Sequence, residues 1–522
     1  MAKFLNSNES ISTSLLLWND ISTQVSIEET FEMDIWPITG NLNDGPINFQ
    51  IPPQPKGMLT DIYIITKLKI QKDGNDLNFR HDSLSVVNNF GNSIWGQVDI
   101  QLDDRIDIMQ SMKNAYPYQT FFNHTLNSES NKVDYLYYNE LFKMDQGSTK
   151  KIEESARTFW KWNDKVDNEI KDLMPTSVTD TMKDDKLNEI KAKLNVSENL
   201  GNYYGTAEYI SSAMGYSSGE KIEELTDIVS RMLLPSKINP AASDRSKFLR
   251  HGESITLCTK LQNPLFNTSK CLPTNVKIRI SLSKNNDEFL ILSDGNSKYG
   301  VNIEDCYLNA TYYKPRDPIL KLIEERIKKE PVPYFISRPE IIVKPISNAG
   351  RIIRIPDVFH NILPPYAFMC LQRSKDFEGS YTTNPYTFIP FQKFQFYVNG
   401  IPYFTDPLEV TNIKKRGDEH YQYMEFGAYM RQLYKTIGKD LKGDCLINSS
   451  NFALHFMIGL TFGADRKSLN ERHLNLQEKA STHLEIDMGI NDGIPEDMLL
   501  IIYAVYDRQI QIDADRKIKI IE

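Results

Sequence analysis

The sequence predicts an all-β protein built from two tandem antiparallel sandwiches of the jelly-roll type. Its 522 residues exceed the roughly 250–300 at which a single hydrophobic core stops growing, so at least two domains are expected. Strand-like alternation bounded by turn residues recurs along most of the chain. The strand signals also occur twice in the same order, which indicates an internal duplication.

The predicted strands combine period-2 alternation with β-branched or aromatic residues. Turn pairs that tolerate positive φ separate many of them, among them Asp73-Gly74, Asp294-Gly295, Asn399-Gly400 and Asp492-Gly493. The strands are expected at 24–34, 62–70, 97–102, 255–261, 276–282, 302–313, 393–398, 453–462, 483–488 and 499–506. Two successive β-domains of about eight strands each, with a short helix between hairpins, suit sandwiches of the jelly-roll kind.

Helical periodicity is less frequent than strand alternation. It predicts helices at 83–93, 116–126, 318–329 and 419–437. The third of these has Pro318 in its first turn and ends in a basic run, which suits the helix dipole and favours a solvated connector.

Four segments of the first half resemble four of the second half in the same order. The segments that begin at Gly57, Asn92, Lys247 and Thr274 match those that begin at Asn361, Phe391, Ser450 and Thr482. Asn92 and Lys247 are 155 residues apart, whereas Phe391 and Ser450 are only 59 apart. The first copy therefore carries about 96 additional residues in one loop.

A polar stretch at 147–245 accounts for that difference. Lys, Glu, Asp, Asn and Ser dominate it, and amphipathic helices are expected at 153–169, 183–194 and 220–233. We therefore predict a first jelly roll at 1–295, with an exposed helical insertion at about 147–245, and a second at 296–522.

Composition disfavours several classes of function. A net charge of −9 argues against extensive binding to nucleic-acid phosphates. The longest apolar run, 498–506, is too short to span a bilayer as a helix. The N-terminus lacks the basic region of a signal peptide, so we expect a protein that is made inside the host cell and is not secreted. The five cysteines, an odd number without a CxxC pair, predict neither a disulfide framework nor a zinc site; they are Cys258, Cys271, Cys306, Cys370 and Cys445.

No signature of catalysis occurs in the chain, which lacks a Walker loop, a dinucleotide fingerprint, HExxH and GxSxG. The best candidate for a metal site is His483, Glu485 and Asp487, which strand geometry places on one face. We interpret this trio as the solvent-facing side of a strand and assign no metal and no cofactor.

Other chemically capable residues also have simpler structural interpretations. His455 lies in an apolar run and is expected to be a hydrogen-bonded core or interface histidine. Asp103-Asp104-Arg105 suits a hairpin corner better than acid–base catalysis. Clustered tyrosines suggest core or subunit packing, although they can also stack on sugars or bases; they are Tyr135, Tyr137, Tyr138, Tyr421, Tyr423, Tyr429 and Tyr434.

Several sequence blocks together resemble one protein family. One block is SVVNNFGNSIWGQVDIQLDD at 85–104, and others lie at 22–38, 115–127, 275–292, 301–315, 376–402 and 499–518. The most specific parts are Val87 to Asp99 and YAVYDRQIQID near the C-terminus. In these blocks the chain resembles the hexon-like, double jelly-roll major capsid proteins of Polinton or Maverick elements and adintoviruses. The stretch at 147–245 has no counterpart in this resemblance.

The resemblance implies a structural protein of a virion and not an enzyme. It implies homotrimers of pseudo-hexagonal outline in an icosahedral shell around a double-stranded DNA genome, with a penton protein and minor capsid proteins as partners. It supplies no catalytic residues. We expect the terminal segments 24–34 and 509–521 near subunit contacts, because terminal strands have edges that need cover. The alternative from another class is a β-sandwich carbohydrate-binding or glycoside-processing protein.

Overall fold

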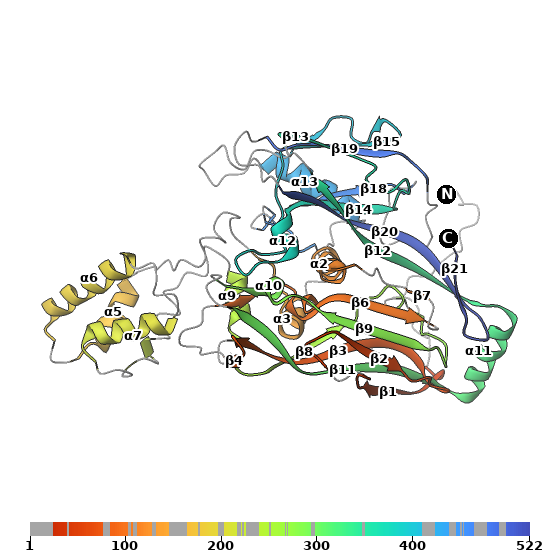
Figure 1. The fold of residues 1–522 in the computed structure, drawn as a ribbon, viewed down its shortest axis with the longest axis horizontal. Helices are drawn as coiled ribbons and strands as arrows, with labels where there is room; N and C mark the ends of the chain where they lie inside the picture. The colour runs from red at the N-terminus through yellow and green to blue at the C-terminus, as the bar shows by residue number, and fades with distance from the viewer. Residues whose placement is uncertain are drawn as a thin grey trace, which may run out of the picture.

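A computed structural model gives the fold of the chain. The described residues are 24–38, 41–76, 84–102, 106–107, 112–127, 132–145, 164–175, 178–196, 203–216, 221, 224–225, 240–249, 252–266, 268, 270–293, 298–346, 350–409, 423–437, 445–448, 451–452, 454–463, 478–489 and 497–521. They form two β-sandwiches and a small group of helices that projects from one end (Figure 1).

The first sandwich consists of two antiparallel sheets. One has the order β1 (Ile27–Ile35), β11 (Tyr299–Pro315), β3 (Met58–Lys72) and β8 (Ile255–Lys260). The other has the order β2 (Pro46–Ile51), β9 (Ile278–Lys284), β6 (Trp95–Leu102) and β7 (Ile106–Asp107).

The second sandwich repeats this design. One sheet has the order β12 (Val332–Ile346), β20 (Met498–Ile512), β14 (Tyr366–Arg373) and β18 (Ile458–Thr461). The other has the order β13 (Ile352–Pro356), β19 (Thr482–Asp487), β15 (Lys393–Val398) and β16 (Ile401–Pro402). Short accessory strands extend these sheets: β4 (Asn75–Asp76), β17 (Leu408–Glu409) and β21 (Ile518–Ile521). A separate two-stranded sheet is formed by β5 (Ser85–Val86) and β10 (Ile291–Leu292).

Both sandwiches have the same topology. When the eight principal strands of each are counted along the chain, the sheets have the order 1-8-3-6 and 2-7-4-5 in both. The four segment pairs matched in the sequence supply equivalent strands: β3 and β14, β6 and β15, β8 and β18, β9 and β19. The predicted internal duplication is therefore confirmed.

The predicted boundary after residue 295 needs correction. β11 begins at Tyr299 and pairs along its length with β1 and β3, so the first sandwich continues to Pro315. Asp294-Gly295 thus precedes the eighth strand of the same sandwich. The helix α11 (Asp317–Lys329) connects the two sandwiches, as expected of a solvated connector.

Alternation along the strands explains how these sheets form. In β9, Ile278, Ile280 and Leu282 are buried, whereas Arg279 is exposed and Ser281 is partly exposed. Apolar residues of both sandwiches join in one continuous buried cluster. Among the described residues, no helix combines the length and apolar composition that crossing a membrane requires.

Two predicted elements differ from the observed ones. The predicted helix at 83–93 is wrong, because this segment forms β5 and only the short α1 (Phe90–Ser93). Asn89 adopts a left-handed conformation with φ of 57°, and the Asn88 side chain accepts a hydrogen bond from the Asn89 amide. The predicted strand at 453–462 is shorter than expected, since a turn held by main-chain bonds to Asn451 precedes β18.

The described residues of the polar insertion are mainly helical. α5 (Asp164–Leu173), α6 (Asp180–Val196) and α7 (Tyr203–Met214) lie together away from the sandwiches (Figure 1). They bury a small core of their own, made by Ile170, Met174, Leu187, Ile190, Ile210 and Met214. Most of the predicted helix at 220–233 and the beginning of that at 153–169 lie outside the described residues.

Candidate functional site at the seam between the sandwiches

The predicted trio on β19 faces one way, as expected. His483, Glu485 and Asp487 are partly exposed, whereas Leu484 and Ile486 are buried on the opposite face. The carboxylates each contact an arginine: Arg354 Nε lies 2.8 Å from Glu485, and Arg351 contacts both oxygens of Asp487 at 3.0 and 3.2 Å.

These contacts set the chemistry of the trio. The hydrogen bond from Arg351 holds the pKa of Asp487 below its usual value. His483 stacks on Tyr397 with ring centroids 4.2 Å apart. The two carboxylates are thus neutralised by arginines in and next to β13. In the described part of the chain, no three His, Cys, Asp or Glu side chains are grouped for metal binding.

Two surface hollows lie among the described residues. One, of about 480 Å³, adjoins His483 and is lined also by Arg354, Pro356 and Asn361. The other, of about 570 Å³, is lined by Asn43, residues 283–288 and Tyr381. The first hollow has one carboxylate, Asp357, and the two of the second, Asp287 and Glu288, are adjacent in the short helix α10 (Asp287–Leu290), where Asp287 pairs with Lys284. Glycoside hydrolysis instead requires two carboxylates that face each other across a cleft.

The remaining sequence candidates occupy varied positions. Asp103, Asp104 and Arg105 lie outside the described residues, between the paired strands β6 and β7. On α3 (Val133–Glu140), Tyr135 and Tyr138 are 45% and 62% exposed.

The other tyrosines lie in or near α13 (Tyr423–Ile437). Tyr429 is buried and stacks on Phe456, in agreement with core packing. Tyr434 is partly buried, whereas Tyr421 and the side chain of Tyr423 lie outside the described residues.

His455 is a hydrogen-bonded core histidine, as predicted. Its Nδ1 lies 2.9 Å from the Tyr386 carbonyl oxygen, and its Nε2 lies 3.3 Å from the Asp145 carbonyl oxygen. Burial lowers its pKa, although the nearby Asp145 carboxylate opposes this effect. Because Asp145 belongs to the first sandwich and His455 to the second, the imidazole connects the two.

A buried ion pair lies beside this histidine at the base of the insertion. Arg245 Nη2 donates to Asp145 Oδ1 at 2.8 Å, and both side chains are fully buried. Arg245 also donates to the carbonyl oxygens of Val86 and Lys143. Asn384 of the second sandwich donates to the other Asp145 oxygen at 2.8 Å.

The pKa of Asp145 reflects these partners. Burial alone would raise it, but the charge of Arg245 and the hydrogen bonds from Arg245 and Asn384 bring it below its usual value. The group is closed to solvent, so we interpret it as a structural junction and not as an acid–base pair for a substrate. It joins both ends of the insertion to both sandwiches.

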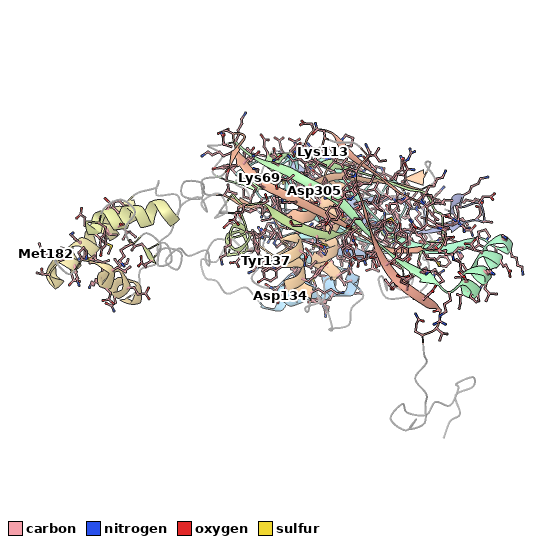
Figure 2. All side chains as sticks on the ribbon, turned by 90° about the horizontal axis from the view of Figure 1, so that it is seen from below. Lys69, Lys113, Asp134, Tyr137, Met182 and Asp305 are labelled. Carbon is pink, nitrogen blue, oxygen red and sulfur yellow. The ribbon has the colours of Figure 1, made fainter. Side chains whose placement is uncertain are left out.

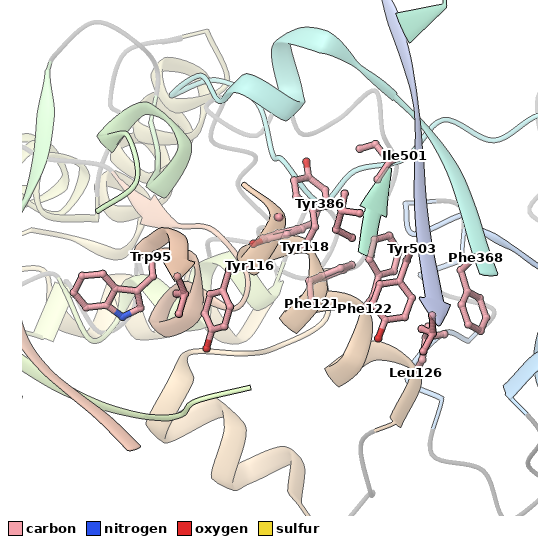
Figure 3. Close-up of a cluster of buried hydrophobic side chains, with 14 of the residues drawn as sticks. Trp95, Tyr116, Tyr118, Phe121, Phe122, Leu126, Phe368, Tyr386, Ile501 and Tyr503 are labelled. Atoms are coloured by element: carbon pink, nitrogen blue, oxygen red, sulfur yellow. The ribbon is translucent and has the colours of Figure 1, made fainter. Parts of the chain in front are cut away.

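Aromatic side chains of α2 (Ala115–Asn127) fill the rest of the seam (Figure 3). Phe121 stacks on Tyr386 at 4.3 Å, and Phe122 stacks on Tyr503 at 5.2 Å. The Tyr118 hydroxyl lies 2.8 Å from Gln372 Oε1 and 2.7 Å from the Pro385 carbonyl oxygen, within hydrogen-bonding distance of both. A helix of the first sandwich thereby covers the outward face of the sheet β12-β20-β14.

Arg516 makes a second contact between the two sandwiches. Arg516 donates to both carboxylate oxygens of Glu324 in α11, at 2.7 and 2.8 Å, and to the Thr274 carbonyl oxygen in the first sandwich. Burial of Glu324 would raise its pKa, but these hydrogen bonds and the charge of Arg516 lower it. The C-terminal segment, the connector and the first sandwich therefore meet at one point.

Sequence reasoning identified His455 and the α2 helix but missed Asp145, Arg245, Asn384 and Arg516. Asp145 and Arg245 are 100 positions apart, and no local pattern relates them. One available signal was their place at the two ends of the polar stretch, where a closed loop needs its ends joined.

Comparison with known proteins establishes the fold. No family model and no curated protein sequence matches the chain. A chain in the cryo-EM structure of the Sputnik virophage aligns with a TM-score of 0.50 and 10% identity, over 100% of this chain and 94% of that one. The PBCV-1 protein VP54, fitted into a Sputnik reconstruction, gives 0.51 and 8%, over 97% and 99%.

A further solved structure agrees. The Faustovirus major capsid protein aligns with a TM-score of 0.50 and 8% identity, over 95% of this chain and 92% of that chain. The alignments span both sandwiches, which share one strand order. The chain is a double jelly roll. The two sandwiches are accordingly called the first and second jelly rolls, and the predicted fold class is confirmed.

Proposed function

We propose that this double jelly roll is a major capsid protein that assembles as homotrimers of pseudo-hexagonal outline. One observation carries the proposal: two jelly rolls of identical strand order are held as one body by the α2 aromatic seam, the Asp145–Arg245 junction and the Arg516 contact. Three such chains around a threefold axis present six similar units, and closed cyclic symmetry is the usual outcome for self-complementary subunits.

The proposal extends to the setting of the protein. The trimers form an icosahedral shell around a double-stranded DNA genome, with a penton protein and minor capsid proteins as partners, in a virion of the Polinton or adintovirus type. The sequence blocks at 85–104 and 503–513 support this finer assignment. The net charge of −9 suits a shell that makes few direct contacts with the genome.

A structural role accounts for the chemistry of the site better than an enzymatic one. The acidic residues on β19 are paired with arginines, and the buried Asp145 and His455 have no access to a substrate. On the exposed face of β19, the carbohydrate alternative has no open aromatic platform, because one face of Tyr397 is covered by His483.

Light scattering after size exclusion tests the proposal. The protein should elute as a species of three 60.3 kDa chains, and negative-stain images should show hexagonal outlines. A protein that stays monomeric at high concentration, or a monomer that binds oligosaccharides on a glycan array, would contradict it.

A further inference from the structure

His455 is a titratable group enclosed between the two jelly rolls of one chain. The first jelly roll contributes the Asp145 carbonyl oxygen, 3.3 Å from Nε2, and Phe121 of α2, whose ring centroid lies 5.6 Å from that of the imidazole. The second contributes the Tyr386 carbonyl oxygen, 2.9 Å from Nδ1. Because His455 is fully buried, a change in its charge acts directly on the contact between the jelly rolls.

The charges around this imidazole are balanced when it carries no charge of its own. Arg245, on α9 (Pro240–Ser246), forms its buried ion pair with Asp145 beside the ring. Among the described residues, these two are the charged groups that act on His455. Burial raises the pKa of the Tyr386 phenol, which therefore stays neutral. A protonated His455 would be a second buried cation beside one carboxylate.

Two effects compete for the proton on His455. Both ring nitrogens face carbonyl oxygens, and a doubly protonated ring could donate to both. Burial of the charge opposes protonation, and so does the positive charge of Arg245. The opposing effects are the larger, and the pKa of His455 lies below its usual value of 6.5. The folded chain therefore keeps the imidazole neutral in a pH range where an exposed histidine is charged.

We propose that His455 is an acid-sensitive switch at which protonation loosens the seam between the two jelly rolls. The inference concerns the single chain and goes beyond the proposed function. Because the pKa of the buried ring is lowered, the open seam binds more protons than the closed one, so the stabilisation is complete above about pH 6.5 and is lost as pH falls below it. The effect reaches at most about tenfold in the opening equilibrium per pH unit, as one proton allows. Asp145, with its pKa lowered from 3.8, keeps its charge throughout this range.

Hydrogen exchange of the full chain at pH 7.5 and pH 5.5, corrected for intrinsic exchange rates, measures this opening. Amides of α2 and of residues 384–388 should lose at least about threefold of their protection at pH 5.5, because the open seam takes up the additional proton. Amides of the insertion helix α6 are the internal reference and should keep their protection, since this helix, which carries Met182, lies away from the sandwiches (Figure 2). An equal loss in α6 would contradict an effect confined to the seam.

The variant His455→Asn should abolish the pH-dependent loss, because its amide can donate to the Tyr386 carbonyl oxygen but takes up no proton in this range. His360→Asn is the matched control and should behave like the wild type, since His360 is exposed and Asn tolerates its left-handed backbone, with φ of 52°. His455→Gln, whose amide reaches towards Asp145, replaces the first variant if that one does not fold. Protection independent of pH in the wild type, or an undiminished loss in the His455 variants, would overturn the inference.

Discussion

Replacing Arg245 by Met should destabilise the protein severely, because it leaves the Asp145 carboxylate buried without its cation. Arg245 makes three hydrogen bonds, to Asp145, Val86 and Lys143, and both members of the ion pair have no exposed side-chain surface. Removal of one partner of such a pair typically costs about 3–5 kcal/mol. We expect that loss in the free energy of unfolding at neutral pH.

The pH dependence should change sign in this variant. In the wild type the pKa of Asp145 is lowered, so its stabilisation is present above the unfolded pKa of about 3.9 and is lost as pH falls through the folded value. Without Arg245, burial dominates and raises the pKa of Asp145 in the folded state. The variant should then lose stability as pH rises through that raised pKa.

Urea unfolding of the Arg245→Met variant, followed by tryptophan fluorescence between pH 5 and pH 8, measures both effects. The double variant Arg245→Met/Asp145→Leu should recover much of the loss, because it removes the unpaired charge. Lys393→Met is the control, since its ion pair with Glu409 is exposed and should contribute less than about 1 kcal/mol. If Arg245→Met lowers the free energy of unfolding by less than about 1 kcal/mol and leaves its pH dependence unchanged, Asp145 and Arg245 do not form the stabilising junction described above.

Three further predictions concern the seam, the insertion and β19. Phe122→Ala should lower the free energy of unfolding by about 3–5 kcal/mol, because Phe122 is fully buried against Tyr503. A thermal transition within about 2 °C of wild type would argue against a stabilising role for the aromatic contacts of α2. Replacing 147–239 with a Gly/Ser linker should leave both jelly rolls folded, as judged by circular dichroism, and failure of both to fold would show that the insertion belongs to the core. Purified protein should contain no stoichiometric metal by mass spectrometry, and metal that is lost on Glu485→Ala would contradict the arginine-paired interpretation of β19.

The sequence was informative where structure depends on local patterns. Alternation in β9 and β19, and the shared order of four segment pairs, were sufficient to predict two equivalent sandwiches. The position of the insertion followed from one unequal spacing, and the burial of His455 followed from its apolar neighbours.

The errors arose where distant contacts or single residues decide the structure. Asp294-Gly295 signals a turn, but a turn inside a sandwich and a domain boundary share that signal, so the eighth strand of the first jelly roll was assigned to the second. Asn88 and Asn89 redirected a segment with helical periodicity through side-chain bonds and a left-handed residue. The Asn384–Asp145 bond joins positions 239 apart, which only the assembled sheets bring together.

Electron cryo-microscopy of the purified chain, with mass determination in solution, tests the central claim most directly. The account predicts a trimer of 60.3 kDa chains in which six jelly rolls surround one threefold axis. A stable monomer at high concentration would contradict it.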